Sequence, residues 1–305
     1  MTGKYLINPH AGYGHEKKGK ILSLIKHVGE ENIVLTSSPT KLQEAVAVLE
    51  ERPPDYIGII GGDGTFSTVQ TALGELNPPV LVFNGGTMNN LHTCLNLPTN
   101  WLKYIQRVVK GSAGLVSIDR LNIEYSNNNG YARRVGCFFG LGLAHKYLQE
   151  YYGDGKPRKR GKLAVINTTA RLIGKSLFSQ KQREKLFLPS YANIKINDMT
   201  IYEYNVVAAS TLPILTTGLY PFDLIKPGAM HAIAANLSLE DILKNFSAIR
   251  KQGSLLQAKQ VHYNNKAQKI IIESDKPLDF VVDGELEQSK GYIEITLAEP
   301  VKIYR

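Results

Sequence analysis

The chain of 305 residues is poor in cysteine and has no long apolar run. Its two cysteines, Cys94 and Cys137, are too few for a disulfide framework and lack the spacing of a metal-binding cluster. No apolar stretch reaches the ~18 residues that a membrane-spanning helix needs. The first residues also lack the long apolar segment of a secretion signal. These absences predict a cytoplasmic protein with reduced thiols.

Acidic residues are outnumbered by basic ones. The chain has 27 Asp and Glu against 36 Lys and Arg, which gives a formal net charge of +9. This excess favours an anionic partner such as a nucleotide, a nucleic acid or an acidic lipid surface. Because the sequence contains no recognised nucleic-acid-binding motif, we do not expect nucleic acid to be the partner.

The apolar pattern of the first ~115 residues alternates between strand and helix. Strands are predicted near residues 4–8, 32–36, 56–60 and 80–83, and the segments between and after them have helical spacing. This order predicts an α/β N-terminal domain with a parallel sheet.

After residue 115 the predicted strands dominate. They include a hairpin at 194–201 with Asn197-Asp198 at its turn. Helical insertions are predicted at about 161–188 and 239–250. The second part is therefore expected to be a mostly β C-terminal domain with helical insertions. We place the α/β domain at 1–117 and the β-rich domain at 118–290, and residues 291–305 are a candidate to return to the first domain.

Three loops follow predicted strands of the first domain, and ligands of parallel sheets bind at the carboxyl ends of strands. Residues 8–14 combine glycines with nearby lysines, which suits phosphate binding or, alternatively, a surface turn. Residues 61–65, Gly-Gly-Asp-Gly-Thr, match no P-loop or dinucleotide fingerprint. They offer backbone N–H groups and the Asp63 carboxylate, a suitable ligand for Mg²⁺. A tight turn with a helix cap is the alternative. Residues 84–90 repeat the pattern, so we interpret the last two loops as opposite walls of one phosphate site.

A pair of carboxylates, Asp283 and Glu285, flanks Gly284 directly after a predicted strand. Such a pair can accept the proton of an attacking hydroxyl or hold a metal near phosphates. Asp-Gly is also a strong hairpin-turn signal, so a purely structural turn is the alternative.

Taken together, these motifs resemble the diacylglycerol kinase catalytic family, above all its soluble bacterial members. The resemblance rests on Asn8-Pro9 with Gly12, Thr36, Gly61–Thr65, Gly86–Asn89 and Asp283–Glu285, in that order. Val135–Gly142 also resembles the strand before a helix in the family's second domain. Sphingosine kinases are relatives of this family, and NAD kinases are more distant ones.

The resemblance implies a lipid kinase that uses ATP and Mg²⁺ to phosphorylate a hydroxyl of diacylglycerol or a similar lipid alcohol. It makes the α/β N-terminal nucleotide-binding domain at 1–117 the ATP-binding domain and the β-rich part at 118–290 the substrate domain. Asp63 would serve Mg²⁺ and the reacting phosphate. Glu285 would accept the proton, with Asp283 beside it and Asp63 as the rival. The nucleotide contacts that it implies are Asn8, Thr36, Gly61, Gly62, Gly64, Thr65, Ser67 and Thr87.

Two departures from the family pattern leave alternatives open. Asn89-Asn90 stands where the family has Asn-Asp, and the segment 224–230, matching a structural Mg²⁺ site of the bacterial members, has no carboxylate, with Asp223 only a weak candidate. The chain could instead phosphorylate a sphingoid base or a soluble acceptor, or bind nucleotide or lipid without turnover. NAD is the least favoured acceptor, because the Asn-Glu pair of NAD kinases is absent.

A basic run suggests peripheral contact with an anionic membrane. Its cationic members are Lys156, Arg158, Lys159, Arg160 and Lys162. Further basic residues and helix-spaced apolar residues follow it as far as Lys185. A solvated basic loop and helix is the alternative reading of this stretch, and the sequence leaves a homodimer open.

Overall fold

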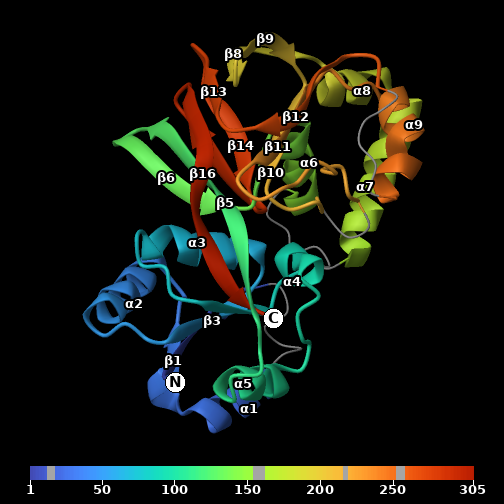
Figure 1. The fold of residues 1–305 in the computed structure, drawn as a ribbon. Coiled ribbons are helices and arrows are strands. Elements are labelled where there is room, and N and C mark those ends of the chain that lie inside the picture. The colour runs from blue at the N-terminus through green and yellow to red at the C-terminus, as the bar shows by residue number, and fades with distance from the viewer. Residues whose placement is uncertain (12–17, 154–161, 216–218, 252–257) are drawn as a thin grey trace. The chain divides into compact units, whose positions relative to one another are not determined.

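The computed structural model describes residues 1–11, 18–153, 162–215, 219–251 and 258–305, apart from the side chains of 162–166. The chain forms two compact units. Unit 1 contains Met1–Ile118 and Glu299–Arg305, and unit 2 contains Asp119–Ala298. Figure 1 shows the elements of both units.

Unit 1 is built on a parallel sheet. Its strands run in the order β2 (Ile33–Leu35), β1 (Gly3–Ile7), β3 (Tyr56–Gly61) and β4 (Val80–Asn84). Each neighbouring pair is parallel. The end of β16 (Tyr292–Tyr304) adds to β4 through the parallel pair Ile303 and Val80. The predicted α/β domain with a parallel sheet is confirmed.

Helices cover both faces of this sheet. In Figure 1, α1 (Lys18–Val28) and α5 (Trp101–Val109) lie on one side, and α2 (Pro39–Glu51) and α3 (Asp63–Leu73) lie on the other. All six residues of β3 are buried, as expected for a strand covered on both faces. Short elements complete the unit, namely the 3₁₀ helix η1 (Glu30–Asn32) and helix α4 (Asn90–Cys94).

Unit 2 is mostly β and contains two sets of strands. One sheet is antiparallel and has the order β12 (Val261–Ala267), β11 (Met230–Ala235), β10 (Val206–Ser210), β7 (Phe138–Gly142), β14 (Leu278–Val282), β15 (Glu285–Ser289). The other set contains the first part of β16 with β13 (Ile270–Glu273), β8 (Ser190–Ile196), β9 (Met199–Tyr204), β5 (Leu115–Asn127) and β6 (Gly130–Gly136). Residues of both sets share one apolar core, in which Phe139 and Phe280 meet Ile194 and Ile272. The predicted β-rich second part is confirmed.

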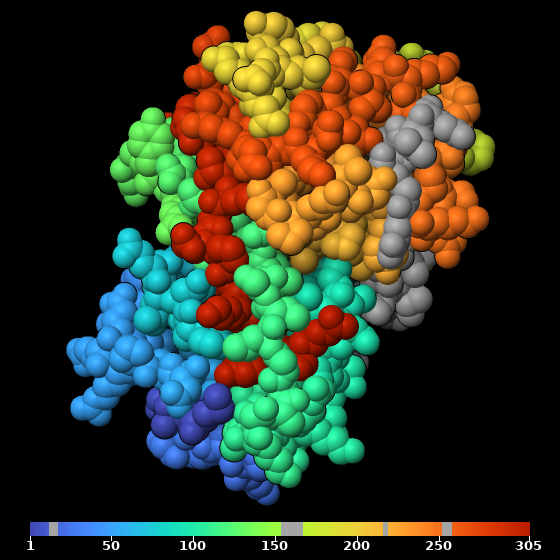
Figure 2. Space-filling view, in the orientation of Figure 1, coloured from blue at the N-terminus to red at the C-terminus, as the bar shows by residue number. Residues whose placement is uncertain are grey.

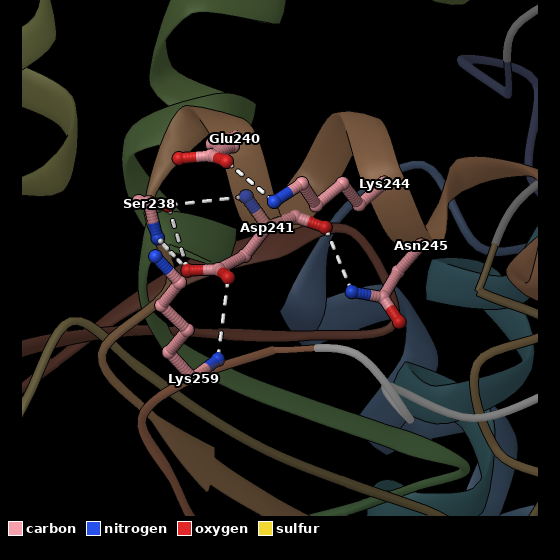
Figure 3. Close-up of polar contacts among 6 residues, drawn as sticks. All are labelled: Ser238, Glu240, Asp241, Lys244, Asn245 and Lys259. Carbon is pink, nitrogen blue, oxygen red and sulfur yellow. Dashed lines mark hydrogen bonds and ion pairs between the residues drawn. The ribbon is translucent and has the colours of Figure 1, made fainter.

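The helical insertions of unit 2 are α6 (Leu143–Tyr152), α7 (Lys162–Phe178), α8 (Gln180–Phe187) and α9 (Leu239–Arg250). Helix α9 begins with a capping box, drawn in Figure 3. Asp241 N donates to Ser238 Oγ at 3.0 Å, and Ser238 N donates to Asp241 Oδ2 at 2.9 Å. Asp241 Oδ1 also accepts from Lys259 N at 3.2 Å, so the buried carboxylate ties the helix start to the segment before β12.

Three elements differ from the sequence prediction. The expected helix at 161–188 is two helices, because the chain bends at Ser179 and restarts with that residue as N-cap. The apolar spacing of the segment after β3 predicts a helix over 66–76, but helix α3 begins earlier, at Asp63, and ends at Leu73 before Gly74, whose φ is 58°. Strand β11 was missed because its sequence, Met-His-Ala-Ile-Ala-Ala, has no alternation, and its pairing with β10 and β12 decides it.

Candidate functional site

The three loops of interest in unit 1 meet at the carboxyl edge of the sheet. Asn8 N donates to Ile60 O at 3.1 Å, and Gly85 N donates to Gly61 O at 2.8 Å. Thr36 follows β2 on the same edge, and its N–H donates to Ile7 O at 2.9 Å. This proximity follows from the strand order, because β1, β3 and β4 are neighbours that run in the same direction.

The Gly-Gly-Asp-Gly-Thr segment turns from strand to helix within one residue. Gly61 ends β3, Gly62 is the N-cap, and Asp63 is the first residue of α3. Thr65 Oγ1 accepts a hydrogen bond of 3.1 Å from Asn8 Nδ2, which joins the first loop to this helix. The first turn of α3 therefore lies at the carboxyl edge of the sheet, where its N–H groups and dipole favour an anion.

Close backbone packing explains several of the glycines. A Cβ added to Gly86 would lie 2.2 Å from Gly62 Cα, and one added to Gly85 would lie 2.5 Å from Gly61 N. The two glycine loops are therefore in direct contact. The interpretation of these loops as walls of one phosphate site stays a prediction, and the two loops touch at these glycines.

Asp63 holds the start of helix α4. Its Oδ2 accepts from Asn90 N at 2.9 Å, and its Oδ1 accepts from Leu91 N at 3.2 Å. Burial raises the pKa of the Asp63 carboxyl above its ordinary value, and the hydrogen bonds from Asn90 N, Leu91 N and its own backbone N–H act in the opposite direction with less effect. The sequence did not indicate this role, because Asn90 and Leu91 lie 27 and 28 residues away.

The fit of this edge to Mg²⁺ depends on Asp63. Among the described residues, no group of three or more His, Cys, Asp or Glu could hold a metal ion. Backbone N–H groups of Asn90, Leu91 and Asp63 itself occupy part of the roughly four lone-pair sites of this carboxylate, which leaves room for a ligand. Mg²⁺ commonly binds through one or two carboxylates, with waters and substrate phosphates as its other ligands. The residues therefore fit a magnesium ion that arrives with a nucleotide.

Asn89 closes the third loop. Its Oδ1 accepts from Gly86 N and its Nδ2 donates to Gly86 O, both at 2.8 Å. Asn89 has a φ of 52°, a left-handed conformation that asparagine tolerates better than most residues. At the other end of the loop, Trp101 Nε1 donates to Asn84 Oδ1 at 2.9 Å. Neither contact was predicted from the sequence, although an asparagine after a glycine turn is a recognisable left-handed signal.

The remaining residues that are predicted to contact the nucleotide differ in their burial. Gly64 lies in the first turn of α3, and Thr87 is half-buried in the third loop. Ser67 is fully buried inside α3, so its hydroxyl faces the protein interior. This burial argues against direct contact between Ser67 and a nucleotide.

In unit 2, Asp283 and Gly284 form the two-residue turn between β14 and β15. Their φ angles are 46° and 92°, as a tight hairpin turn requires. Asp283 accepts hydrogen bonds from Cys137 N at 2.8 Å and Phe138 N at 2.9 Å. Cys137 lies between β6 and β7, and Phe138 is the first residue of β7. The turn reading of the Asp-Gly pair is therefore right, and the Asp283 carboxylate joins this turn to the adjacent strand.

Glu285 differs from both aspartates. It is the exposed first residue of β15, and its carboxylate has no hydrogen-bond or ion-pair partner within the part of the chain that the structure describes. The Gly284 carbonyl before it accepts a hydrogen bond of 2.7 Å from Tyr152 Oη at the end of α6. The backbone next to Glu285 is thus held from two sides, while its side chain is free to meet a ligand.

Two other regions were singled out in the sequence, namely the segment 224–230 and the basic run that ends at Lys162. In the segment 224–230, Gly228 N donates to Asp119 Oδ2 at 2.7 Å, and Asp223 Oδ1 lies 3.8 Å from His231 Nδ1. Lys162 is the first residue of α7, but its side chain is outside the described part. The other members of the predicted membrane-binding run lie outside the described residues, namely Lys156, Arg158, Lys159 and Arg160.

Comparison with known proteins relates the first part of the chain to one family. Residues 4–120 match the model of the diacylglycerol kinase catalytic domain. Over these residues the chain is similar to the diacylglycerol kinase catalytic family. The predicted resemblance is confirmed, and the family is one of kinases.

Individual relatives agree with this assignment. A Staphylococcus aureus protein (strain bovine RF122 / ET3-1) named "Putative lipid kinase" is 22% identical over 238 residues, which cover 76% of this chain and 71% of that protein. The structure of a diacylglycerol kinase from Bacillus anthracis aligns with a TM-score of 0.62 at 15% identity, over 99% of this chain and 96% of that one. Yeast NADH kinase complexed with NADH aligns with a TM-score of 0.54 at 14% identity, over 100% of this chain and 83% of that one. The two structural matches show a shared fold.

One further finding bears on membranes. None of the helices in the described residues is both long enough and apolar enough to cross a lipid bilayer.

Proposed function

We propose that the protein is an ATP-dependent lipid kinase that phosphorylates a hydroxyl of diacylglycerol or a similar lipid alcohol. The observation that carries this proposal is the carboxyl edge of unit 1. Within a region similar to the kinase family, the ends of three parallel strands converge on the first turn of α3 through the Asn8–Thr65, Gly61–Gly85 and Asp63–Asn90 hydrogen bonds.

The nucleotide phosphates would bind at this edge. The N–H groups of the first turn of α3 supply donors, and Gly62 and Gly64 have no side chains to obstruct a phosphate. Asn8, Thr36 and Thr87 lie on loops of the same edge and would complete the contacts. Asp63 would hold a magnesium ion that neutralises the phosphate charge. We leave Ser67 out of the proposed contacts because its side chain is buried.

Glu285 would accept the proton in the transfer. The acceptor hydroxyl loses its proton to the Glu285 carboxylate as its oxygen forms a bond to the γ-phosphorus. The bond between that phosphorus and the bridging oxygen breaks, and ADP leaves with the electron pair. Asp283 would position this group, because its carboxylate fixes the turn that precedes Glu285.

The proposal can be tested with labelled ATP, Mg²⁺ and vesicles that contain total cell lipid. We expect label in one lipid class, and we expect Glu285→Gln to lower the transfer rate by about a hundredfold or more, since general-base groups contribute that much. Glu285 is exposed, so the substitution is expected to leave folding unchanged. Glu44→Gln, on the exposed side of α2, is the matched control and should keep full activity.

Three other results would each contradict a different part of the proposal. Unchanged transfer in Glu285→Gln would remove Glu285 from the mechanism. Label in a sphingoid base, in NAD or in another soluble compound would keep the kinase and change its acceptor. Bound ATP without transfer to any acceptor would indicate a non-catalytic relative.

A further inference from the structure

We propose that the end of α7 and the whole of α8, residues 175–188, form a docking surface for an anionic membrane. We call this surface the α7–α8 corner. The inference deepens the proposed function and rests on it, since a kinase that acts on lipid must meet its acceptor at a membrane. Its first support is apolar exposure, because Phe178 is 93% exposed, Leu188 64% and Leu177 49%.

Hydrogen bonds and packing hold the α7–α8 corner in place. Only Ser179 separates the two helices, and Ser179 N donates to Lys175 O at 2.9 Å. Arg183 Nε donates to Ser176 O at 3.0 Å and so satisfies a carbonyl at the end of α7. Leu186 is buried and anchors α8 to unit 2. Phe178 is therefore held exposed by an ordered bend between two helices.

The arrangement along α8 suits a helix that lies on a bilayer. Eight residues of helix span about 12 Å. Phe178 precedes this helix and Leu188 follows it, so apolar side chains stand at both ends. Between them, Lys181, Arg183 and Lys185 are exposed. Helices that lie in a membrane interface combine apolar anchors with cations in this way.

Charge selects the partner. From residue 162 to residue 191 the only acidic residue is Glu184, against six basic residues, which are Lys162, Arg171, Lys175, Lys181, Arg183 and Lys185. Arg171 and Lys185 both lie within 4 Å of Glu150, at 3.4 and 3.7 Å. Lys175 and Lys181 are exposed and have no ion-pair partner among the described residues. A basic surface with apolar anchors complements anionic lipid, whereas the same surface of a second copy would repel it.

Vesicle binding by the full chain tests the surface without any catalysis. The vesicles contain phosphatidylcholine alone, or equal amounts of phosphatidylcholine and phosphatidylserine. We expect Phe178→Ser to weaken binding to the mixed vesicles about tenfold, because it removes an exposed apolar side chain that the membrane would bury. We expect Lys181→Gln to weaken binding to the mixed vesicles about fivefold and to leave the weak binding to phosphatidylcholine unchanged.

Matched controls come from unit 1. Val48→Ser removes an apolar side chain that is 57% exposed, and Lys41→Gln removes an exposed lysine, both on α2. We expect both controls to bind as the unmodified protein does. Equal binding of Phe178→Ser, Lys181→Gln and the unmodified protein would overturn the proposal. A dimer in sedimentation that Phe178→Ser dissociates, without binding to vesicles, would also overturn it and assign the surface to a second copy.

An activity measurement separates this inference from the proposed function. The acceptor is a short-chain diacylglycerol dissolved as monomers, which needs no membrane. We expect Phe178→Ser to phosphorylate it as fast as the unmodified protein and to be slower only on vesicles. A difference on the soluble acceptor would count against a docking role. If no phosphate is transferred but vesicle binding depends on Phe178, the kinase proposal fails and the docking surface stands.

Discussion

At the scale of single residues, two aspartates from different motifs use their carboxylates in the same way. Asp63 accepts hydrogen bonds from two successive backbone N–H groups at the start of α4. Asp283 does the same with Cys137 and Phe138. A change at either position therefore affects local structure as well as chemistry. Glu285 is the carboxylate that can be altered without this complication.

Asp63→Asn is expected to lower stability as well as activity. The amide has one acceptor where the carboxylate has two, so a donor NH₂ would face a backbone N–H group of α4. Hydrogen bonds to charged groups contribute about 1.5–3 kcal/mol, and we expect a loss of this order in the free energy of unfolding. Urea unfolding measures it, with Asp198→Asn at an exposed hairpin turn as control. Equal midpoints for the Asp63 variant and the unmodified protein would show that these bonds contribute little.

The buried ring of His231 makes the stability of unit 2 depend on pH. Burial lowers its pKa below the ordinary value of 6.5, although the nearby Asp223 and a hydrogen bond with Asn264 act in the opposite direction. The unfolded chain then takes up the proton first. The contribution of the neutral ring is therefore fully present above pH 6.5 and is lost as the pH falls from 6.5 toward the lowered pKa.

We expect unfolding free energies measured on both sides of pH 6.5 to decrease on acidification, and His231→Gln to flatten this decrease. Burial also lowers the pKa of His145, so part of the slope should remain in the variant. A slope that is identical with and without His231 would exclude it as a source.

At the scale of elements, the approach of two loops decides where glycine is needed. Gly86 Cα lies so close to Gly62 that a methyl group at Gly86 has no room. Gly174, inside α7, has open space around the position of a Cβ. We therefore expect position 174 to tolerate alanine and position 86 not to tolerate it.

Gly86→Ala should destabilise unit 1 by about 1–3 kcal/mol, which is typical of overpacking, and should weaken ATP binding by displacing the loops. Gly174→Ala should stabilise α7 by about 0.5–1 kcal/mol, because alanine is a better helix former. Thermal unfolding and ATP titration of both variants provide the comparison. A harmless Gly86→Ala would mean that the loops can move apart freely.

At the scale of the whole molecule, the last residues complete the first unit. Ile303 pairs with Val80, and the backbones of Arg305 and Gly114 exchange two hydrogen bonds of 2.7 and 3.1 Å. Figures 1 and 2 show the red C-terminal end beside the green segment that leads into β5. Val301, Ile303 and Tyr304 are buried. Residues far apart in the sequence therefore share the core of unit 1.

Removal of residues 299–305 should consequently weaken unit 1 more than unit 2. The deletion exposes the edge of β4 and takes away three buried side chains, each worth about 1.5–3 kcal/mol. Hydrogen exchange resolved by segment should show faster exchange in β3 and β4, with little change in β10 and β11. Equal protection in the truncated and full chains would show that unit 1 is complete without its C-terminal strand.

Much of the fold was predictable because it depends on local patterns. Alternating strand and helix signals indicated the parallel sheet, and Asn197-Asp198 marked a hairpin, which Asn197 forms with a φ of 50°. The carboxyl-edge loops followed from strand direction. Two features were not predicted correctly. The start of α3 was placed too late, since no pattern shows that Gly62 alone makes the turn. Strand β11 was missed because its alanines carry no β signal.

The sequence by itself determined the fold class, the kinase family motifs and the order of the loops, because apolar periodicity and glycine positions act over short distances along the chain. Only the tertiary structure decided the use of each polar group. It assigned Asp63 and Asp283 to backbone N–H groups, buried Ser67, and left Glu285 and Phe178 exposed. The physical reason is that hydrogen-bond partners and burial depend on which distant segments come together, and nothing local in the sequence encodes that.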